Sequence, residues 1–188
     1  MDHYIEISLM PSPEFPAHIL MSALYSRLHG TLANAGRNDV GVSFPQMGIS
    51  GVGGLGAIMR LHGLATTLVP WATPGWLSGL KDHCEHTSVL PIPDGSGFRT
   101  VSRVQAKSNV ERLRRRQMRR HGLTEVEARE HVPESAEKTL SDPFVRITSS
   151  STGQTFLLFV RHGPIRASPV YGAFTTYGLS RDATIPWF

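Results

Sequence analysis

Residues 4–9 read Tyr-Ile-Glu-Ile-Ser-Leu, so that apolar and polar side chains alternate along the chain. This alternation is typical of a β-strand with one buried face. From Ile19 to Leu32, apolar residues recur at helical spacing, which predicts an amphipathic helix of about five turns. Gly36 and Asn38 follow and are suited to end that helix. The chain therefore opens with a strand and then a helix.

The next residues extend this order of elements. We expect a short helix over 76–81 and strands over 40–44, 57–61 and 83–90. The order strand–helix–strand–strand–helix–strand is the split βαβ pattern of a ferredoxin-like domain. The prediction is an α+β protein whose residues 1–94 form that domain.

A second α+β domain is expected over residues 95–188, after the proline- and glycine-rich linker 91–97. It carries an arginine-rich helix over 111–120 and a short acidic helix after it. Ser108 and Thr124 are placed to cap these two helices. The other expected elements are an extended segment over 98–105, strands over 144–148 and 155–161 joined by the hairpin loop 149–154, and a last strand over 174–177.

Composition narrows the class of protein. The chain has 188 residues, 40% of them hydrophobic, and a formal net charge of +4. This is globular composition, and the charge allows an anionic partner without requiring one. A single cysteine, Cys84, rules out an internal disulfide and fits a reducing compartment. The sequence contains no signal-peptide pattern and no apolar run of about 18 residues. We therefore expect a cytoplasmic protein with no membrane partner.

The arginine-rich helix has two unlike faces. Its basic face carries Arg112, Arg116, Arg119 and Arg120, with Arg115 at the edge, and its apolar face carries Val110, Leu113 and Met118. Like charges four residues apart cost roughly 0.2–0.5 kcal/mol per pair in an isolated helix. A solvated basic face is one interpretation. The other, which we favour, is that phosphate groups supply the missing negative charge.

Arg103 and Gln105 stand two residues apart on the extended segment just before this helix. On a strand, such side chains point to the same side. Arginine can bind the guanine edge and glutamine the adenine edge. The alternative, two solvated residues on an edge strand, stays open from the spacing.

Three groups of side chains are candidates for catalysis. His29 lies near the end of the first helix, and because a histidine ring can take up and release a proton it could be a general base, or only a histidine that favours the helix dipole. The loop serines Ser149, Ser150 and Ser151 offer hydroxyls, or simply form a polar turn. Tyr177, beside Gly178, could reach a site or could be a core residue.

Two patterns do not indicate sites. Residues 51–56 match G-x-G-x-x-G, but a dinucleotide site needs a strand before it and a helix after it. Residues 83–86 contain metal-competent groups without a second ligand pair at zinc spacing. We expect no metal and no cofactor.

Several blocks of sequence carry a resemblance when they are taken together. They are Met1-Asp-His-Tyr4, Pro13-Glu-Phe-Pro16, Leu28-His29, Gly41-Val-Ser-Phe-Pro45, Ser102-Arg-Val-Gln-Ala-Lys-Ser-Asn109, Glu111-Arg-Leu-Arg-Arg-Arg116, Met118-Arg-Arg-His121, Ser151-Thr-Gly-Gln154, Arg161-His-Gly-Pro164, Tyr177-Gly-Leu-Ser180 and Pro186-Trp-Phe188. With these blocks the chain resembles the CRISPR-associated endoribonucleases that process pre-crRNA in type I-F systems. The resemblance is weakest over residues 46–97.

The resemblance implies an activity. Enzymes of this family bind the stem-loop of each CRISPR repeat and cut at the 3′ base of the hairpin. The 2′-hydroxyl of the RNA attacks, no metal is needed, and the upstream product ends in a 2′,3′-cyclic phosphate. The enzyme stays on the mature crRNA as a subunit of the type I-F surveillance complex.

The resemblance also implies residue roles. His29 would be the base, Ser149 would hold the ribose, and Tyr177 would position His29. The RNA-binding residues would be Arg103 and Gln105 on stem bases, Phe156 on the terminal base pair, Ser151 on a phosphate, and Arg112, Arg115, Arg116, Arg119 and Arg120 in the major groove or on phosphates. A non-catalytic RNA-binding subunit is the alternative, and a regulator with the helix in DNA is a third reading.

Overall fold

The computed structural model describes residues 1–188 except 50, 52, 106–109, 134–139 and 150–152. The contacts divide the chain into two compact units. Unit 1 comprises Met1–Arg103 and Pro143–Phe188, and unit 2 comprises Val104–Asp142. Helices and antiparallel sheets occur together, so the predicted α+β class is confirmed. The predicted domain boundary between residues 94 and 95 stays a prediction.

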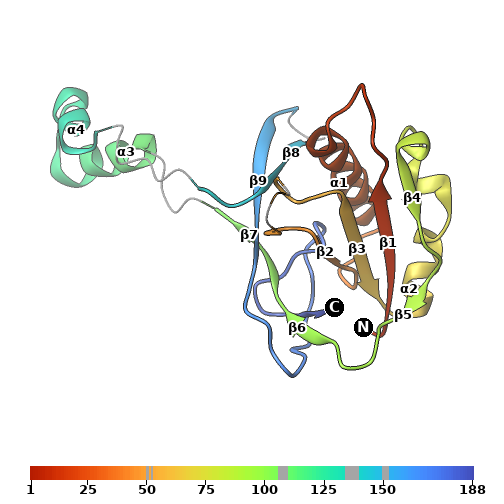
Figure 1. Cartoon of the computed structure of the whole chain (residues 1–188). Helices are drawn as coiled ribbons and strands as arrows, with labels where there is room; N and C mark the ends of the chain where they lie inside the picture. The colour runs from red at the N-terminus through yellow and green to blue at the C-terminus, as the bar shows by residue number, and fades with distance from the viewer. Residues whose placement is uncertain (50, 52, 106–109, 134–139, 150–152) are drawn as a thin grey trace. The chain divides into compact units, whose positions relative to one another are not determined.

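The main sheet of unit 1 forms around the alternating strand β1 (Figure 1). Its strands run in the order β2-β3-β1-β4, with β5 also paired to β1, and every pairing is antiparallel. Ile5 and Ile7 of β1 are fully buried, as the alternation predicted. The strands are β1 (His3–Leu9), β2 (Gly41–Ser43), β3 (Ile58–Gly63), β4 (Cys84–His86) and β5 (Leu90–Pro91).

Helix α1 (Ala17–Asn34) shares the core of this sheet, with Leu24 and Leu28 completely buried. It ends as predicted at Gly36, whose φ of 60° is the left-handed conformation that glycine tolerates. The N–H of Gly36 donates to Ala33, and the N–H of Arg37 donates to Leu32. This pair of bonds satisfies carbonyls of the last turn. The stop keeps residues near the C-terminal end of α1, His29 among them, in fixed positions.

The single helix predicted over 76–81 is wrong. In its place the chain forms a series of short turns, α2 (Ala65–Leu68), η1 (Val69–Trp71), η2 (Pro74–Leu77) and η3 (Lys81–His83). Pro74 opens η2, and Gly79 has a positive φ of 82°, so neither residue allows one continuous helix. The predicted strand 83–90 is likewise split into β4 and β5.

Two further sheets complete unit 1. Strands β7 (Val101–Val104), β8 (Phe144–Thr148) and β9 (Thr155–His162) form a sheet in the order β7-β9-β8, which confirms the predicted hairpin. Strand β10 (Ile185–Trp187) pairs with β6 (Gly97–Arg99). Helix α1 packs on β8, where the Arg146 N–H donates to Ser22 Oγ at 3.1 Å.

The strand predicted over 174–177 is also wrong. This segment is a turn closed by Gly178, whose N–H donates to the Thr175 carbonyl at 2.8 Å. Because the segment is a turn and not an extended strand, it can direct the Tyr177 side chain toward His29 on helix α1.

The described residues of unit 2 include the helices α3 (Val110–His121) and α4 (Glu125–His131). The predicted capping box of α4 is confirmed, since Thr124 and Glu127 exchange hydrogen bonds. Ser108, the predicted cap of α3, lies outside the described residues. The buried side chains of this unit include Val110, Ala128 and Val132.

The two patterns that do not indicate sites fall in a loop and at the start of β4. Residues 53–56 form a loop that leads into β3 and not into a helix. Cys84 is buried on β4, which raises the pKa of its thiol to about 11. Over the residues that the structure describes, no helix is long and apolar enough to cross a membrane.

Candidate active site

His29 is held by a backbone carbonyl. Its Nδ1 lies 2.9 Å from the carbonyl oxygen of Thr176. Since a carbonyl oxygen can only accept, Nδ1 must carry the proton of this hydrogen bond. In the neutral ring Nε2 then has a lone pair free to take up a proton. The side chain is half-buried, so the ring is both held and accessible.

The ring of Tyr177 lies flat on the ring of His29. Their centroids are 3.8 Å apart, and the two planes differ by only 9°. The stack fixes the plane of the imidazole, while the bond to Thr176 fixes its rotation within that plane. Together the two contacts determine the direction in which Nε2 points.

The turn that supplies these contacts is tied to the main sheet. The Val42 N–H on β2 donates to the Gly178 carbonyl at 2.9 Å. Gly178 has a φ of 68°, and a Cβ there would collide with the Val42 side chain. Glycine is therefore required for both conformation and space. The sheet thus positions Tyr177 opposite helix α1.

Tyr25 holds the backbone of this turn through a hydrogen bond. Its hydroxyl donates to the Tyr177 carbonyl at 2.7 Å. Burial raises the pKa of the Tyr25 phenol well above its usual value, so it remains a donor at neutral pH. Tyr25 precedes His29 by four residues on α1 and so lies on the same side of the helix. Tyr25 was not predicted as a site residue, although its spacing of four residues from His29 places both on one side of the helix.

The guanidinium of Arg103 contacts two aromatic side chains, one of them the Tyr177 ring of this stack. Its guanidinium carbon lies 5.3 Å from the ring centroid of Phe156 and 5.9 Å from that of Tyr177. Both distances are within cation–π range. Four residues that were predicted separately, His29, Tyr177, Arg103 and Phe156, are thereby connected in one cluster of unit 1.

Ser149 lies at the start of the hairpin loop that follows β8. Its N–H donates to the Gln154 carbonyl at 2.9 Å. Ile147, two residues earlier on β8, pairs with Phe156 of the cluster. Two strand residues span about 7 Å, so Ser149 starts its loop near that end of the cluster. Ser151 lies outside the described residues.

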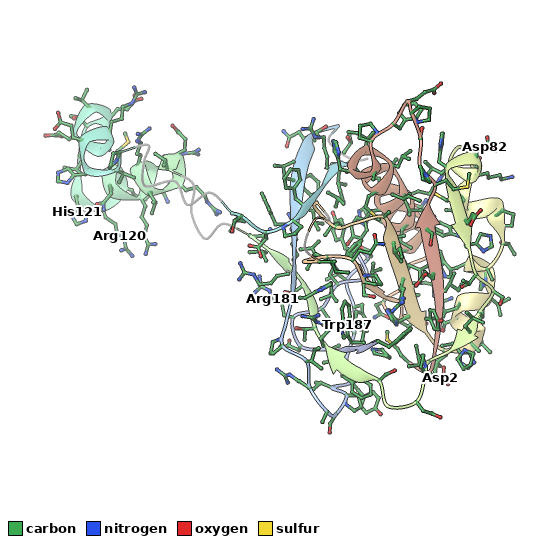
Figure 2. All side chains as sticks on the ribbon, in the orientation of Figure 1. Asp2, Asp82, Arg120, His121, Arg181 and Trp187 are labelled. Atoms are coloured by element: carbon green, nitrogen blue, oxygen red, sulfur yellow. The ribbon has the colours of Figure 1, made fainter. Side chains whose placement is uncertain are left out.

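Gln105 and the predicted basic residues of unit 2 are on its surface. Gln105 is exposed directly after β7. Arg114, which the helix wheel left off the basic face, is half-buried, and its Nε donates to the Val132 carbonyl at 3.0 Å. The predicted basic face is therefore exposed and the opposite face packs on α4. The exposed arginines are Arg112, Arg115, Arg116, Arg119 and Arg120, and Figure 2 shows the Arg120 side chain projecting from the helix.

The cluster suits proton transfer from a bound substrate to His29. A neutral imidazole with a fixed tautomer can accept a proton, and the arginine beside it can bind an anion. Among the described residues, no group of three or more His, Cys, Asp or Glu side chains could hold a metal ion.

Comparison with known proteins gives a consistent result. Residues 4–188 match the family model described as CRISPR-associated protein (Cas_Csy4). The chain is 48% identical over 188 residues to a CRISPR-associated endonuclease Cas6/Csy4 of Pseudomonas aeruginosa (strain UCBPP-PA14), which covers 100% of both chains. It is 46% identical, with the same full coverage, to a protein of that name from Escherichia coli (strain UTI89 / UPEC).

Proposed function

The chain belongs to the CRISPR-associated Cas_Csy4 family, and we propose that it is the endoribonuclease that cuts pre-crRNA at the 3′ base of each repeat hairpin. Two full-length relatives are named as CRISPR-associated endonucleases. The single observation that carries the proposal is the tautomer of His29. Its Nδ1 is committed to the Thr176 carbonyl, which leaves Nε2 to act as a base.

The proposed reaction uses a nucleophile that belongs to the RNA. His29 Nε2 takes the proton of the 2′-hydroxyl at the cut site, and the 2′-oxygen attacks the adjacent phosphorus. The bond from phosphorus to the 5′-oxygen of the next nucleotide breaks, and that oxygen takes up a proton from water. The products are a 2′,3′-cyclic phosphate and a 5′-hydroxyl, without a metal ion. General-base assistance of this kind contributes about 10²–10⁴-fold.

The cluster around His29 would also hold the RNA. Tyr177 positions the base, Ser149 holds the ribose, and Ser151 contacts a nearby phosphate. Arg103, which already lies against Phe156, reads the lowest stem bases with Gln105. Phe156 stacks on the terminal base pair, a contact worth about 1–3 kcal/mol. The 2′-hydroxyl requirement makes cutting specific to RNA.

The basic face of α3 would bind the stem. Arg116 and Arg120 enter its major groove, and Arg112, Arg115 and Arg119 bind phosphates. The exposure of all five side chains supports this assignment. An A-form major groove is normally too narrow for a helix, but a short hairpin opens at its end. We also propose that the protein acts in the cytoplasm and stays on the crRNA within the type I-F surveillance complex.

The N-terminal half would be a ferredoxin-like domain over residues 1–94, followed by the RNA-binding domain over 95–188. The strand order β2-β3-β1-β4 with antiparallel pairing supports the first assignment.

Incubation of a repeat hairpin with equimolar protein in excess EDTA tests the function. The expected result is cutting at one position, with a cyclic phosphate on the upstream fragment. Intact RNA after long incubation would refute the nuclease, and tight binding of that intact RNA would instead indicate a non-catalytic subunit.

A further inference from the structure

A half-open cavity of about 550 Å³ adjoins the catalytic cluster in unit 1. Ligand sites usually have volumes of about 300–1,000 Å³, so there is room for a nucleotide. Its lining includes Arg103, Thr176, Tyr177, Ser180, Arg181 and Asp182. The proposed roles of His29, Arg103 and Phe156 concern only the RNA upstream of the cut, so this cavity has no assigned ligand.

The cavity shares its wall with the groups that hold His29. The Thr176 carbonyl accepts the His29 hydrogen bond, and the Tyr177 ring stacks on the imidazole. Both residues also line the cavity. A molecule bound there would therefore lie directly beside the base.

The loop that carries Arg181 is held in place. The Ser180 N–H donates to the Val101 carbonyl on β7, the strand that also bears Arg103. The Ser180 hydroxyl accepts the Ala183 N–H at 3.0 Å. These bonds fix the backbone on both sides of Arg181. Two arginines thus face one cavity from anchored positions.

The guanidinium of Arg181 is available for a ligand. Figure 2 shows this side chain at the surface of unit 1, and it is exposed. In the part of the chain that the structure describes, Arg181 makes no ion pair with a carboxylate. Asp182 also lines the cavity and would repel an anion, so a phosphate there would bind to the guanidinium groups of Arg103 and Arg181 and away from the Asp182 carboxylate.

We propose that this cavity receives the nucleotide on the 3′ side of the scissile phosphate, and that Arg181 binds the phosphate that follows that nucleotide. The inference rests on the proposed function. In a displacement at phosphorus the attacking and leaving oxygens lie roughly in line. Since Phe156 stacks on the terminal base pair of the stem and does not line this cavity, the leaving strand needs a path away from Phe156, and the cavity provides one next to Tyr177.

Single-turnover cutting of two RNAs tests the proposal. One RNA ends one nucleotide past the cut and lacks the phosphate in question; the other extends four nucleotides past it. The ratio of the rate constants, long RNA over short RNA, should exceed one for the unaltered chain. Arg181→Ala should lower this ratio about 3- to 10-fold, because one charge-assisted contact is lost, and Arg181→Glu should lower it further. Arg166→Ala removes an exposed arginine that does not line the cavity and should leave the ratio unchanged.

Equal rates on the two RNAs, or an unchanged ratio in both Arg181 variants, would overturn the inference while leaving the nuclease intact. If the unaltered chain cuts neither RNA, the proposed function itself falls, and the inference falls with it.

Discussion

The imidazole of His29 lies flat against the phenol ring of Tyr177, with ring centroids 3.8 Å apart. His29 comes from helix α1, whereas Tyr177 belongs to a turn near the other end of the sequence. The Tyr25 hydroxyl, also on α1, holds the backbone of that turn. The direction of Nε2 is thus a product of tertiary structure, and the predictions below follow from it.

Replacing the base should separate cutting from binding. His29→Ala removes the group that takes up the proton, so the single-turnover rate should fall about 10²–10⁴-fold. Affinity for the hairpin should stay within a few fold, since the arginines remain. His18→Ala changes an exposed histidine of the same helix and should cut normally. A loss of hairpin affinity in His29→Ala, measured by filter binding, would show that His29 is structural.

The ring of Tyr177 should matter more than its hydroxyl. Tyr177→Phe retains the stack on His29 and should cut at nearly the normal rate. Tyr177→Leu loses an aromatic pair worth about 0.5–1.5 kcal/mol and should cut about 2- to 10-fold more slowly. Rate constants at saturating protein distinguish the two. If Tyr177→Phe were as slow as Tyr177→Leu, the hydroxyl would have a direct role in the reaction.

Substitutions on the exposed side of α3 should weaken RNA binding, and a substitution on its packed side should lower stability. Arg115→Ala and Arg119→Ala each remove an exposed charge that we propose to bind a phosphate, which should weaken hairpin binding and reduce its salt dependence by about 0.7–0.9 log units per log unit of salt. Arg114→Ala removes the hydrogen bond to the Val132 carbonyl, so it should lower the melting temperature while the salt dependence stays normal. Equal salt dependence in all three variants would argue against a phosphate-binding face.

Acid should destabilise the fold through His62. This side chain is fully buried, with Nε2 2.8 Å from Ser43 Oγ, and burial lowers its pKa to about 3. The unfolded chain binds that proton near pH 6.5, so between pH 6.5 and 3 the unfolded state holds more protons. Stability is therefore complete above pH 6.5 and falls as the pH drops, by roughly 1 kcal/mol per pH unit for this group.

Urea denaturation at pH 7, 6 and 5 measures this effect. Burial also lowers the pKa of His162, to about 4, which acts in the same direction. His62→Leu should therefore flatten the pH dependence only in part. As a check within the unaltered protein, the His62 ring should show no NMR titration between pH 5 and 8. A titration in that range would contradict the account.

Local patterns predicted much of the fold. The alternation in β1, the apolar stripe of α1 and the Thr124 capping box are signals carried by neighbouring residues, and each is confirmed. Strand β10 was missed because Ile185, Pro186 and Trp187 pair with residues far away in the sequence on β6. The turn at 174–177 was mistaken for a strand because its apolar and aromatic residues resemble one. A local bond from Gly178 to Thr175 closes the turn, and bonds from the distant residues Val42 and Tyr25 hold it in place.

The residues of the candidate site were predicted, but their arrangement in space was not. His29, Tyr177, Arg103 and Phe156 were each named from the sequence or its family resemblance. The tautomer of His29 depends on a carbonyl 147 residues away in the chain, which no local pattern indicates. The roles assigned to all the predicted site residues stay predictions.

The central claim is that the 2′-hydroxyl of the RNA attacks with His29 as its base. A repeat hairpin carrying one 2′-deoxy nucleotide immediately upstream of the cut tests this most directly, alongside the all-ribose hairpin. The account predicts that both RNAs bind with equal affinity and that only the all-ribose RNA is cut. Cutting of the deoxy-substituted hairpin at the normal rate and position would contradict it.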